Sequence, residues 1–493
     1  MCDNNQTQTP PMVYDICSFG AVGDGIALNT KAIQEAIDTC SGNGGGTVLV
    51  PNGSFLTGTI RLKSNVEVHL APTAILLGST NLADYPTDVA RCGFVNETHI
   101  DRCLVYAEDA YNIAITGRGT IDGQGAAFKG KVEQGEGGDR PMLIRCWHSE
   151  RIVIEGVTLR NAGAWCAHFR ESVDVRVTGV TIHNLVCWNN DGIDLMSTSR
   201  VRISDCTIIC LDDAICFQSM SNDKPVEDIV INNCVLSTRW SAIRSGGAHA
   251  GGIRNVTVSN CVIKNTWGCG IKLQASGNCS FENMTFSNIV MPNVSTPISL
   301  RFGNAHYNSE TRDESRPWGT MRNIMFNNIW ASVVDEERLR REVQFPEFYE
   351  GEQKQCISIC GIPGHPVEGI TLSDIHVSFP GGGTKEDAAN VDSDERENDY
   401  PEYFMWGVLP AYGLYARHAR AIALNNVRFE LRDKDLRPAI VLDDVQEADI
   451  SNLRAALDPE VDALVKTRDS ETYLTNSRVL GGIASDAKLV SGF

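Results

Sequence analysis

Short runs in which aliphatic residues alternate with other residues recur along most of the chain. Alternation with a period of two predicts β-strands. Between Ile152 and Met284 the runs recur at a nearly constant interval, as expected for the coils of a repeat protein. The runs begin at Ile113, Ile152, Val175, Val201, Ile229, Val256, Met284, Ile324, Ile370, Ile422 and, more weakly, Ile450.

The near-constant interval predicts that each strand lies directly above the preceding one, with a rise of about 4.8 Å per coil. Asn233, Asn260 and Asn328 fall at the same turn of successive repeats, so we expect their side chains to hydrogen-bond along that turn. Crossover helices long enough for an α/β fold are absent between these strands. The pattern therefore predicts a parallel β-helix as a single domain over residues 13–493.

The N-terminal region has a different pattern. A glycine-rich turn precedes a stretch with helical periodicity at 31–40, for which Asn29 and Thr30 are the expected capping residues. One face of this helix would carry Ala32, Ile33, Ala36 and Ile37. We expect this helix to cap the first coil.

The repeat interval widens after Met284, since the later runs begin only at Ile324, Ile370 and Ile422. Insertions into a solenoid usually form loops on one face, often the binding face. We expect such loops around 300–320, 335–360 and 380–410. The last contains the aromatic run 400–406, for which packing onto the solenoid is favoured over stacking on a sugar ring.

Charge and cysteine content exclude several classes of function. The chain has 43 Lys and Arg against 62 Asp and Glu, a net charge of −19, which disfavours nucleic acids and anionic membranes as partners. No stretch is apolar enough to span a membrane. None of the 17 cysteines has zinc-ligand spacing, so no metal is predicted, and Cys206, Cys234 and Cys261 are expected to form a row of buried thiols. Oligomeric state stays open.

Residues 1–12 form a polar tail that opens with Met1-Cys2. No signal peptide is present in the sequence. The tail is similar to that of a bacterial lipoprotein trimmed to its acylated cysteine, and the alternative is a chance cysteine in a disordered terminus. We expect a secreted, periplasmic or cell-surface lipoprotein location.

Three carboxylates recur at the repeat interval. Asp212 and Asp213 follow Asp191 by one short coil, so they should be its neighbours on the adjacent coil. The Asp212-Asp213 pair has no basic residue among its sequence neighbours. Adjacent carboxylates raise at least one pKa, which gives a general acid beside an ionised base. Two such groups separated by ~6.5–9.5 Å hydrolyse glycosidic bonds with inversion. The alternative is a calcium site or a solvated acidic ridge.

Cations continue the same ridge. Arg239 follows Asp212 by one repeat interval, and Lys272 follows Arg244 by another. These intervals place the cations on the coils that follow the carboxylates.

The chain resembles the polygalacturonase family of glycoside hydrolases, family 28, of the pectin-lyase-like β-helix superfamily. The motifs that carry the resemblance span the chain: Phe19-Gly20-Ala21-Val22-Gly23-Asp24-Gly25, Gly119-Thr120-Ile121-Asp122-Gly123-Gln124-Gly125, Asn189-Asn190-Asp191 and Asp212-Asp213. The implied fold class is all-β: a single right-handed parallel β-helix with an N-terminal capping helix and long loops on one face. The resemblance implies that Asp212 is the general acid, that Asp191 and Asp213 activate water, that configuration inverts, and that no cofactor is needed.

The chain departs from the family pattern in two motifs. Arg239 stands near the family's histidine, and Gly270-Ile271-Lys272 keeps the lysine of an Arg-Ile-Lys motif but loses its arginine. In polygalacturonases these cations meet the substrate carboxylate. Arg239, Arg244 or Arg301 could restore a positive subsite. His249 is the best substitute for the missing histidine, and Trp188 and Trp240 could stack on sugar faces, with burial against a neighbouring coil as the equal alternative.

The sequence thus predicts an inverting glycoside hydrolase whose partner is a carbohydrate, a pectic or related acidic glycan of galacturonide or rhamnogalacturonan type. Rhamnogalacturonan hydrolases also lack the histidine. The alternatives are a polysaccharide lyase or epimerase on the same fold, often calcium-dependent, and a non-catalytic carbohydrate-binding solenoid.

Overall fold

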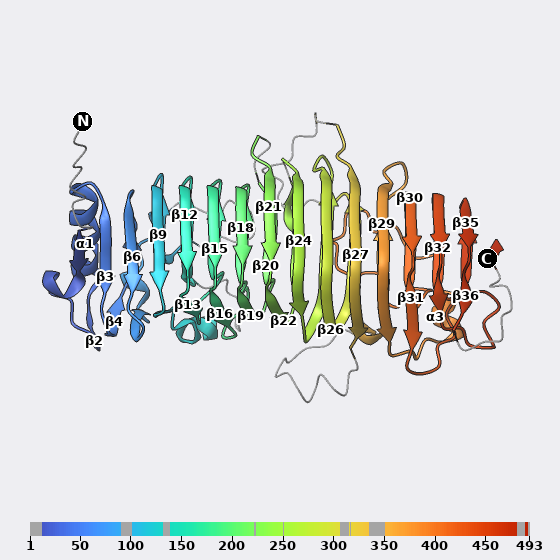
Figure 1. The fold of residues 1–493 in the computed structure, drawn as a ribbon, viewed down its shortest axis with the longest axis horizontal. Helices are drawn as coiled ribbons and strands as arrows, with labels where there is room; N and C mark the ends of the chain where they lie inside the picture. Colours follow the sequence, from blue (N-terminus) through green and yellow to red (C-terminus); the bar gives the residue numbers. More distant parts are fainter. Residues whose placement is uncertain are drawn as a thin grey trace, which may run out of the picture.

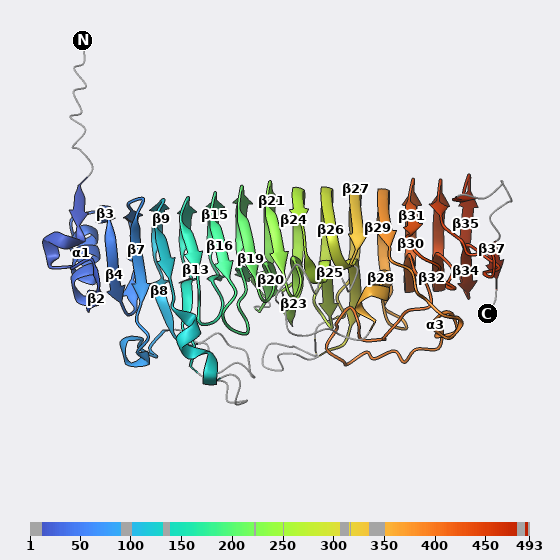
Figure 2. The ribbon, with the colours of Figure 1, turned by 90° about the horizontal axis from the view of Figure 1, so that it is seen from below.

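The protein is a right-handed parallel β-helix in the computed structural model, which describes residues 12–89, 101–131, 139–220, 223–249, 251–305, 315, 317–334, 351–480 and 489–491. All strand pairs between successive coils are parallel, and the strands stack into one continuous sheet that winds around the solenoid axis. The fold class predicted from the repeat is confirmed (Figures 1 and 2).

Each coil contributes strands to three rows. The first row contains the aliphatic repeat identified in the sequence, with Ile152, Val175, Val201 and Ile229 in direct register. Its members are β1 (Val13–Asp15), β3 (Gly46–Val50), β6 (Val66–Leu70), β9 (Tyr111–Gly117), β12 (Glu150–Glu155), β15 (Val173–Thr178), β18 (Ser199–Ser204), β21 (Val226–Asn232), the first parts of β24 (Ile253–Ile263), β26 (Phe281–Gly303), β27 (Met321–Val333) and β29 (Val367–Phe379), the later parts of β30 (Leu414–Asn425) and β32 (Ile440–Ser451), and β35 (Thr472–Thr475).

The second row follows a short turn. It comprises β2 (Asp24–Leu28), β4 (Gly53–Thr57), β7 (Ala74–Gly78), β10 (Thr120–Asp122), β13 (Thr158–Arg160), β16 (Thr181–Asn184), β19 (Thr207–Cys210), β22 (Val235–Thr238), the middle or end of β24, β26, β27 and β29, and β31 (Arg428–Leu431), β33 (Arg454–Ala455) and β36 (Arg478–Val479).

The third row carries the candidate chemistry. It comprises β5 (Ile60–Arg61), β8 (Cys103–Glu108), β11 (Met142–Trp147), β14 (Ala167–Arg170), β17 (Ile193–Met196), β20 (Ile215–Ser219), β23 (Ile243–His249), β25 (Thr266–Ser276), the end of β26, β28 (Ile357–Cys360), the first parts of β30 and β32, β34 (Val465–Arg468) and β37 (Leu489–Ser491).

The core is the interior of the solenoid. The inward-facing aliphatic side chains of the three rows form one continuous buried cluster from Ile16 to Val465. Cys206, Cys234 and Cys261 are buried free thiols on successive coils, as predicted. Outside, Asn288 links Asn260 and Asn328 by amide hydrogen bonds of 3.2 and 2.8 Å, which confirms the predicted row for these two residues, while the Asn233 amide donates to Asp205.

One repeat was assigned incorrectly from the sequence. Ile422 pairs with Ala448, and Ile450 pairs with Leu424, so the last of the predicted repeats begins at Ala448, before the predicted start at Ile450. The inward position of that coil is filled by alanine, and a search for branched aliphatics therefore misses it.

Helix α1 (Thr30–Gly42) covers the N-terminal end of the solenoid (Figure 1). Its buried face includes Ile33, Ala36 and Ile37. The prediction that the Asn29 side chain caps this helix is wrong. That side chain instead accepts a 2.7 Å hydrogen bond from the backbone N–H of Val22 and so holds the glycine-rich turn. Within the described residues, the other helical segments are the 3-10 turns η1 (Ile16–Phe19), η2 (Leu82–Asp84), η3 (Gly125–Lys131) and η4 (Glu352–Lys354), and the short helix α3 (Lys385–Ala388).

The segment at 380–410 lies between β29 and β30 and includes α3. Figure 2 shows it on the side of the solenoid where β25 and β28 lie. Of the other two predicted insertions, positions 306–314, 316 and 335–350 lie outside the described residues, as do Cys2 and the rest of the predicted tail up to residue 11. No helix among the described residues is long and apolar enough to cross a membrane.

Candidate active site

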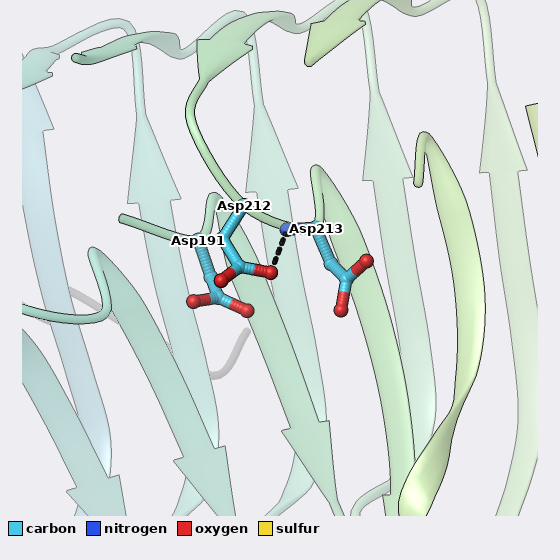
Figure 3. A group of neighbouring side chains, drawn as sticks. All are labelled: Asp191, Asp212 and Asp213. Atoms are coloured by element: carbon cyan, nitrogen blue, oxygen red, sulfur yellow. Dashed lines mark hydrogen bonds between the residues drawn. The ribbon is translucent and has the colours of Figure 1, made fainter. Parts of the chain in front are cut away.

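The three predicted catalytic aspartates lie together at the turns that lead into β17 and β20. One carboxylate oxygen from each of Asp191, Asp212 and Asp213 lies within 4.8 Å of the others (Figure 3). Asp191 and Asp213 are buried, whereas Asp212 is half-buried. The interval of one short coil therefore brought these side chains together as predicted.

Local sequence fixes the turn that carries Asp191. The buried Asn190 amide donates hydrogen bonds of 3.0 Å to the carbonyls of Ala162 and Ala164, and its oxygen accepts 2.8 and 2.6 Å bonds from the backbone of Val186 and Cys187. With this amide satisfied on both sides, the turn has one conformation, and Asp191 is held against the next coil.

Gly192 permits the close stacking of that coil. A Cβ at this position would lie 2.3 Å from the carbonyl oxygen of Ala214, which is nearer than any side chain can approach. The backbone of Gly192 donates a 2.9 Å hydrogen bond to the carbonyl of Asp213. The glycine thus sets the distance between the coil of Asp191 and the coil of Asp213.

Burial and mutual repulsion raise the pKa of two of the carboxyls. Burial raises the pKa of Asp212 to about 7, with the negative charge of Asp213 as the second cause. Burial, followed by the charge of Asp212, raises the pKa of Asp191 well above its usual range. Near neutral pH this pair holds a proton that an isolated aspartate would have lost.

Asp213 has a different environment. Its carboxylate forms a 2.5 Å ion pair with the Nη1 of Arg244 and accepts a 3.2 Å hydrogen bond from the backbone of Ser241. No basic neighbour of this pair was evident in the sequence, because Arg244 comes from the next coil. The site therefore contains an ion-paired carboxylate beside two carboxyls of raised pKa.

The oxygens are closer than the ~6.5–9.5 Å expected for the two carboxyls of an inverting hydrolase. Asp191 lies on the coil directly next to that of Asp212 and Asp213, and because adjacent strands are only about 4.8 Å apart, the nearest oxygens of these carboxyls come close together. The stereochemical outcome therefore does not follow from this separation.

Of the predicted cations, Arg244, Lys272 and Arg301 are in the same row of strands, and Arg239 is in the turn before β23. Lys272 in β25 pairs directly with Arg244 in β23, as the repeat interval between them predicted. Lys272 is 1% exposed, and its Nζ lies 2.7 Å from an oxygen of Glu402. Arg239 is buried, with Nη1 3.7 Å from Glu352. These contacts come from residues that the sequence analysis did not single out.

Arg301 is farther along the row, at the end of β26. Its guanidinium donates hydrogen bonds of 2.6 and 2.7 Å to the carbonyls of Gly361 and Glu395 and lies 5.0 Å from the ring centre of Trp406. Burial lowers its pKa. In this structure Arg301 binds the backbone of the turn that follows β28 and of the segment inserted between β29 and β30.

The predicted aromatic residues and histidine are placed differently from one another. Trp188 is 53% exposed, on the turn just before the Asn189-Asn190-Asp191 motif. Trp240 packs against Phe404, with ring centres 6.4 Å apart, and lies 5.8 Å from the Nζ of Lys272. His249 is the last residue of β23, where its backbone pairs with Ser219, and its side chain lies outside the described part of the chain.

Comparison with known proteins shows the family of this chain. The family model "Glycosyl hydrolases family 28" matches residues 40–346. A probable polygalacturonase of Vitis vinifera is 32% identical over 380 residues, which cover 73% of each protein. An exo-poly-alpha-D-galacturonosidase of Dickeya chrysanthemi is 26% identical over 341 residues, which cover 58% of this chain and 56% of that protein.

Solved structures show the same fold. An exopolygalacturonase from Thermotoga maritima superimposes with a TM-score of 0.62 at 23% identity, covering 85% of this chain and 93% of that one. The family 28 exopolygalacturonase of Yersinia enterocolitica gives a TM-score of 0.63 at 19% identity, covering 96% of this chain and 79% of that one. With the family model matching more than half of its length, the chain belongs to glycosyl hydrolases family 28 and is a glycoside hydrolase.

Proposed function

We propose that the protein hydrolyses glycosidic bonds in pectic or related acidic glycans with inversion of configuration. In this proposal Asp212 protonates the leaving oxygen, and Asp191 and Asp213 activate water. The observation that carries it is the cluster of three carboxylates within 4.8 Å, two of them with a raised pKa.

The environments of Asp212 and Asp213 support these roles. Asp212 is half-buried and has a pKa of about 7, so that below neutral pH it carries a proton to donate. Asp213 is ion-paired with Arg244, which keeps its oxygens in place as acceptors. Asp191 and Asp212 repel each other when both are ionised, so near neutral pH the pair shares a proton, and the proposed roles place that proton on Asp212 in the complex with substrate.

The substrate class rests on relatives. Those described above are named as acting on galacturonides, and an endo-xylogalacturonan hydrolase of Aspergillus tubingensis is 25% identical over 295 residues. We propose a galacturonide or rhamnogalacturonan substrate on that basis. Trp188, exposed beside the Asp191 turn, is the residue best placed to stack on a sugar ring. Export of the protein to its glycan is part of the same proposal.

The decisive test is Asp212→Asn. We expect kcat on the best pectic oligosaccharide to fall by at least about 1,000-fold, because the amide cannot donate the acid proton, while the circular dichroism spectrum is unchanged. Asp205→Asn is the matched control: this exposed aspartate, in the turn between β18 and β19, should leave turnover unchanged. Activity of Asp212→Asn close to wild type would contradict the assignment.

The products distinguish the alternatives. NMR of the first-formed anomer should show inversion, and retention would exclude the water-activating roles. The same three oxygens are close enough to ligate one cation, so calcium and a chelator belong in the assay. An unsaturated, ultraviolet-absorbing product that requires calcium would establish a lyase. Binding without any product, unaffected by loss of all three aspartates, would establish a carbohydrate-binding solenoid.

A further inference from the structure

The lysine expected to meet a substrate carboxylate already has a carboxylate partner within the chain. The Nζ of Lys272 and an oxygen of Glu402 are 2.7 Å apart, and their side chains are 1% and 11% exposed. Glu402 is far from Lys272 in sequence and belongs to the segment inserted between β29 and β30. The positive charge at this position is therefore neutralised before any substrate binds.

Neighbouring residues of the insertion hold Glu402 in place. The hydroxyl oxygen of the buried Tyr403 lies 2.7 Å from a carboxylate oxygen of Glu352 and 3.1 Å from the carbonyl oxygen of Trp267. Phe404 packs against Trp240, and Trp406 lies over Arg301. Residues next to Glu402 are thus anchored to the solenoid.

This neutralised position lies next to the catalytic carboxylates. Lys272 pairs in register with Arg244, and Arg244 binds Asp213 at 2.5 Å. The ring of Tyr400, from the same insertion, lies 5.6 Å from the Arg244 guanidinium. The pair formed by Lys272 and Glu402 therefore lies one strand beyond the residue that binds Asp213, where the proposed function places the neighbouring subsite.

A free uronate is poorly matched to this pair. Its carboxylate would be brought close to that of Glu402, with one ammonium group to serve both, and like charges in a partly buried position repel strongly. A neutral sugar, or a uronate whose acid is esterified, brings no such charge. A fixed repulsive group of this kind is a common source of specificity.

We propose that Glu402 is a specificity-determining residue, which makes the subsite beside Lys272 accept a neutral or esterified sugar and reject a free uronate. This inference rests on the proposed glycosidase function. Within the pectic glycans it favours a backbone in which a neutral sugar alternates with a uronate over a polymer of free uronates.

The test compares wild type, Glu402→Gln and Asp399→Asn on three substrates: a free oligogalacturonide, its methyl ester, and a rhamnogalacturonan oligosaccharide. Asp399 is the matched control, since it is an exposed carboxylate of the same insertion that pairs with Arg396 instead. We expect Glu402→Gln to raise kcat/KM on the free acid by about 10- to 100-fold, as expected when one charge-assisted hydrogen bond becomes available to the substrate. Turnover of the other two substrates should change less than about threefold in both variants.

A second variant shows whether the gain depends on the released ammonium group. In Lys272→Met with Glu402→Gln, the gain on the free acid should disappear. A wild-type enzyme that prefers the free acid, together with an unchanged or lower kcat/KM on it in Glu402→Gln, would overturn the inference.

The experiments distinguish failure of the hydrolase proposal from failure of the proposed role of Glu402. If wild type cleaves none of the three substrates, the hydrolase proposal fails, and calorimetric titration with the free oligogalacturonide still decides the role of Glu402. Tighter binding by Glu402→Gln than by wild type supports the inference, and equal or weaker binding overturns it.

Discussion

At the scale of single residues, ionisation of Asp191 and Asp212 lowers the stability of the folded protein. Both carboxyls would ionise near pH ~4 in the unfolded chain, but burial and mutual repulsion raise their pKa in the folded protein. The folded state therefore binds more protons than the unfolded state between these two pKa values. Stability that is fully present below about pH 4 is lost as the pH rises through about 7.

Replacement of the acid should consequently stabilise the fold. We expect Asp212→Asn to raise the midpoint of thermal unfolding by roughly 2–5 °C at pH 8, because the amide needs no proton in this buried position. At pH 4 the difference from wild type should vanish, since the wild-type carboxyl is then neutral. Differential scanning calorimetry at the two pH values checks this, with Asp205→Asn as the exposed control. A lower midpoint for Asp212→Asn at pH 8 would show that the charge of Asp212 does not destabilise the folded protein.

At the scale of structural elements, the site depends on how closely neighbouring turns stack. The turn before β17 is held by the amide of Asn190, and Gly192 lets the following coil approach to hydrogen-bond distance. The insertion that contains α3 depends on the opposite kind of residue, since Tyr403 and Phe404 pack onto the solenoid as large side chains. Packing of the aromatic run, favoured from the sequence over sugar stacking, agrees with these contacts.

Gly192→Ala tests the stacking of the turns. The added methyl group has no room against the Ala214 carbonyl, so the two coils must separate, at a cost of about 1–3 kcal/mol. Because that movement also separates Asp191 from Asp213, kcat should fall by at least about tenfold. Chemical denaturation and initial rates measure the two effects. Gly42→Ala, at the end of α1 with open space around the new methyl group, is the control and should lower neither stability nor kcat.

At the scale of the whole molecule, the solenoid would expose its apolar core at each end unless another element covered that end. Successive coils satisfy each other's backbone hydrogen bonds, but the first coil has a neighbour on one side only. Helix α1 covers that end with the buried residues Ile33, Ala36, Ile37 and Cys40. The helix thus protects both the apolar interior and the first strand edge.

Ile37→Asp should remove that protection. A charge without a partner in the apolar contact between α1 and the first coils is expected to cost more than about 3 kcal/mol and to expose the strand edge, so that molecules associate end to end. Light scattering after gel filtration and a thermal melt would detect this, with Glu35→Ala on the outer face of the same helix as the control. A monomer with an unchanged melting point would mean that α1 is dispensable as a cap.

The sequence by itself determined what repeats. The interval between Ile152 and Met284 predicted the solenoid and the register of its strands, and the offset of one short coil placed Asp191 beside Asp212 and Asp213. Both succeed because a residue's neighbour one coil away lies at a nearly fixed distance along the sequence. The start of the repeat predicted at Ile450 was wrong because alanine, at Ala448, occupies the inward position.

The tertiary structure alone decided which charges meet. The partners of Lys272 and Arg239 are Glu402 and Glu352, which come from segments without the repeat interval. Arg244 reaches Asp213 from a strand on the neighbouring coil. Insertions carry no periodic signal, and the burial that raises the pKa of Asp212 depends on everything packed around it. The repeat interval in the sequence therefore determines where the carboxylates lie. The tertiary structure determines which of them is charged and which cation is free for a substrate.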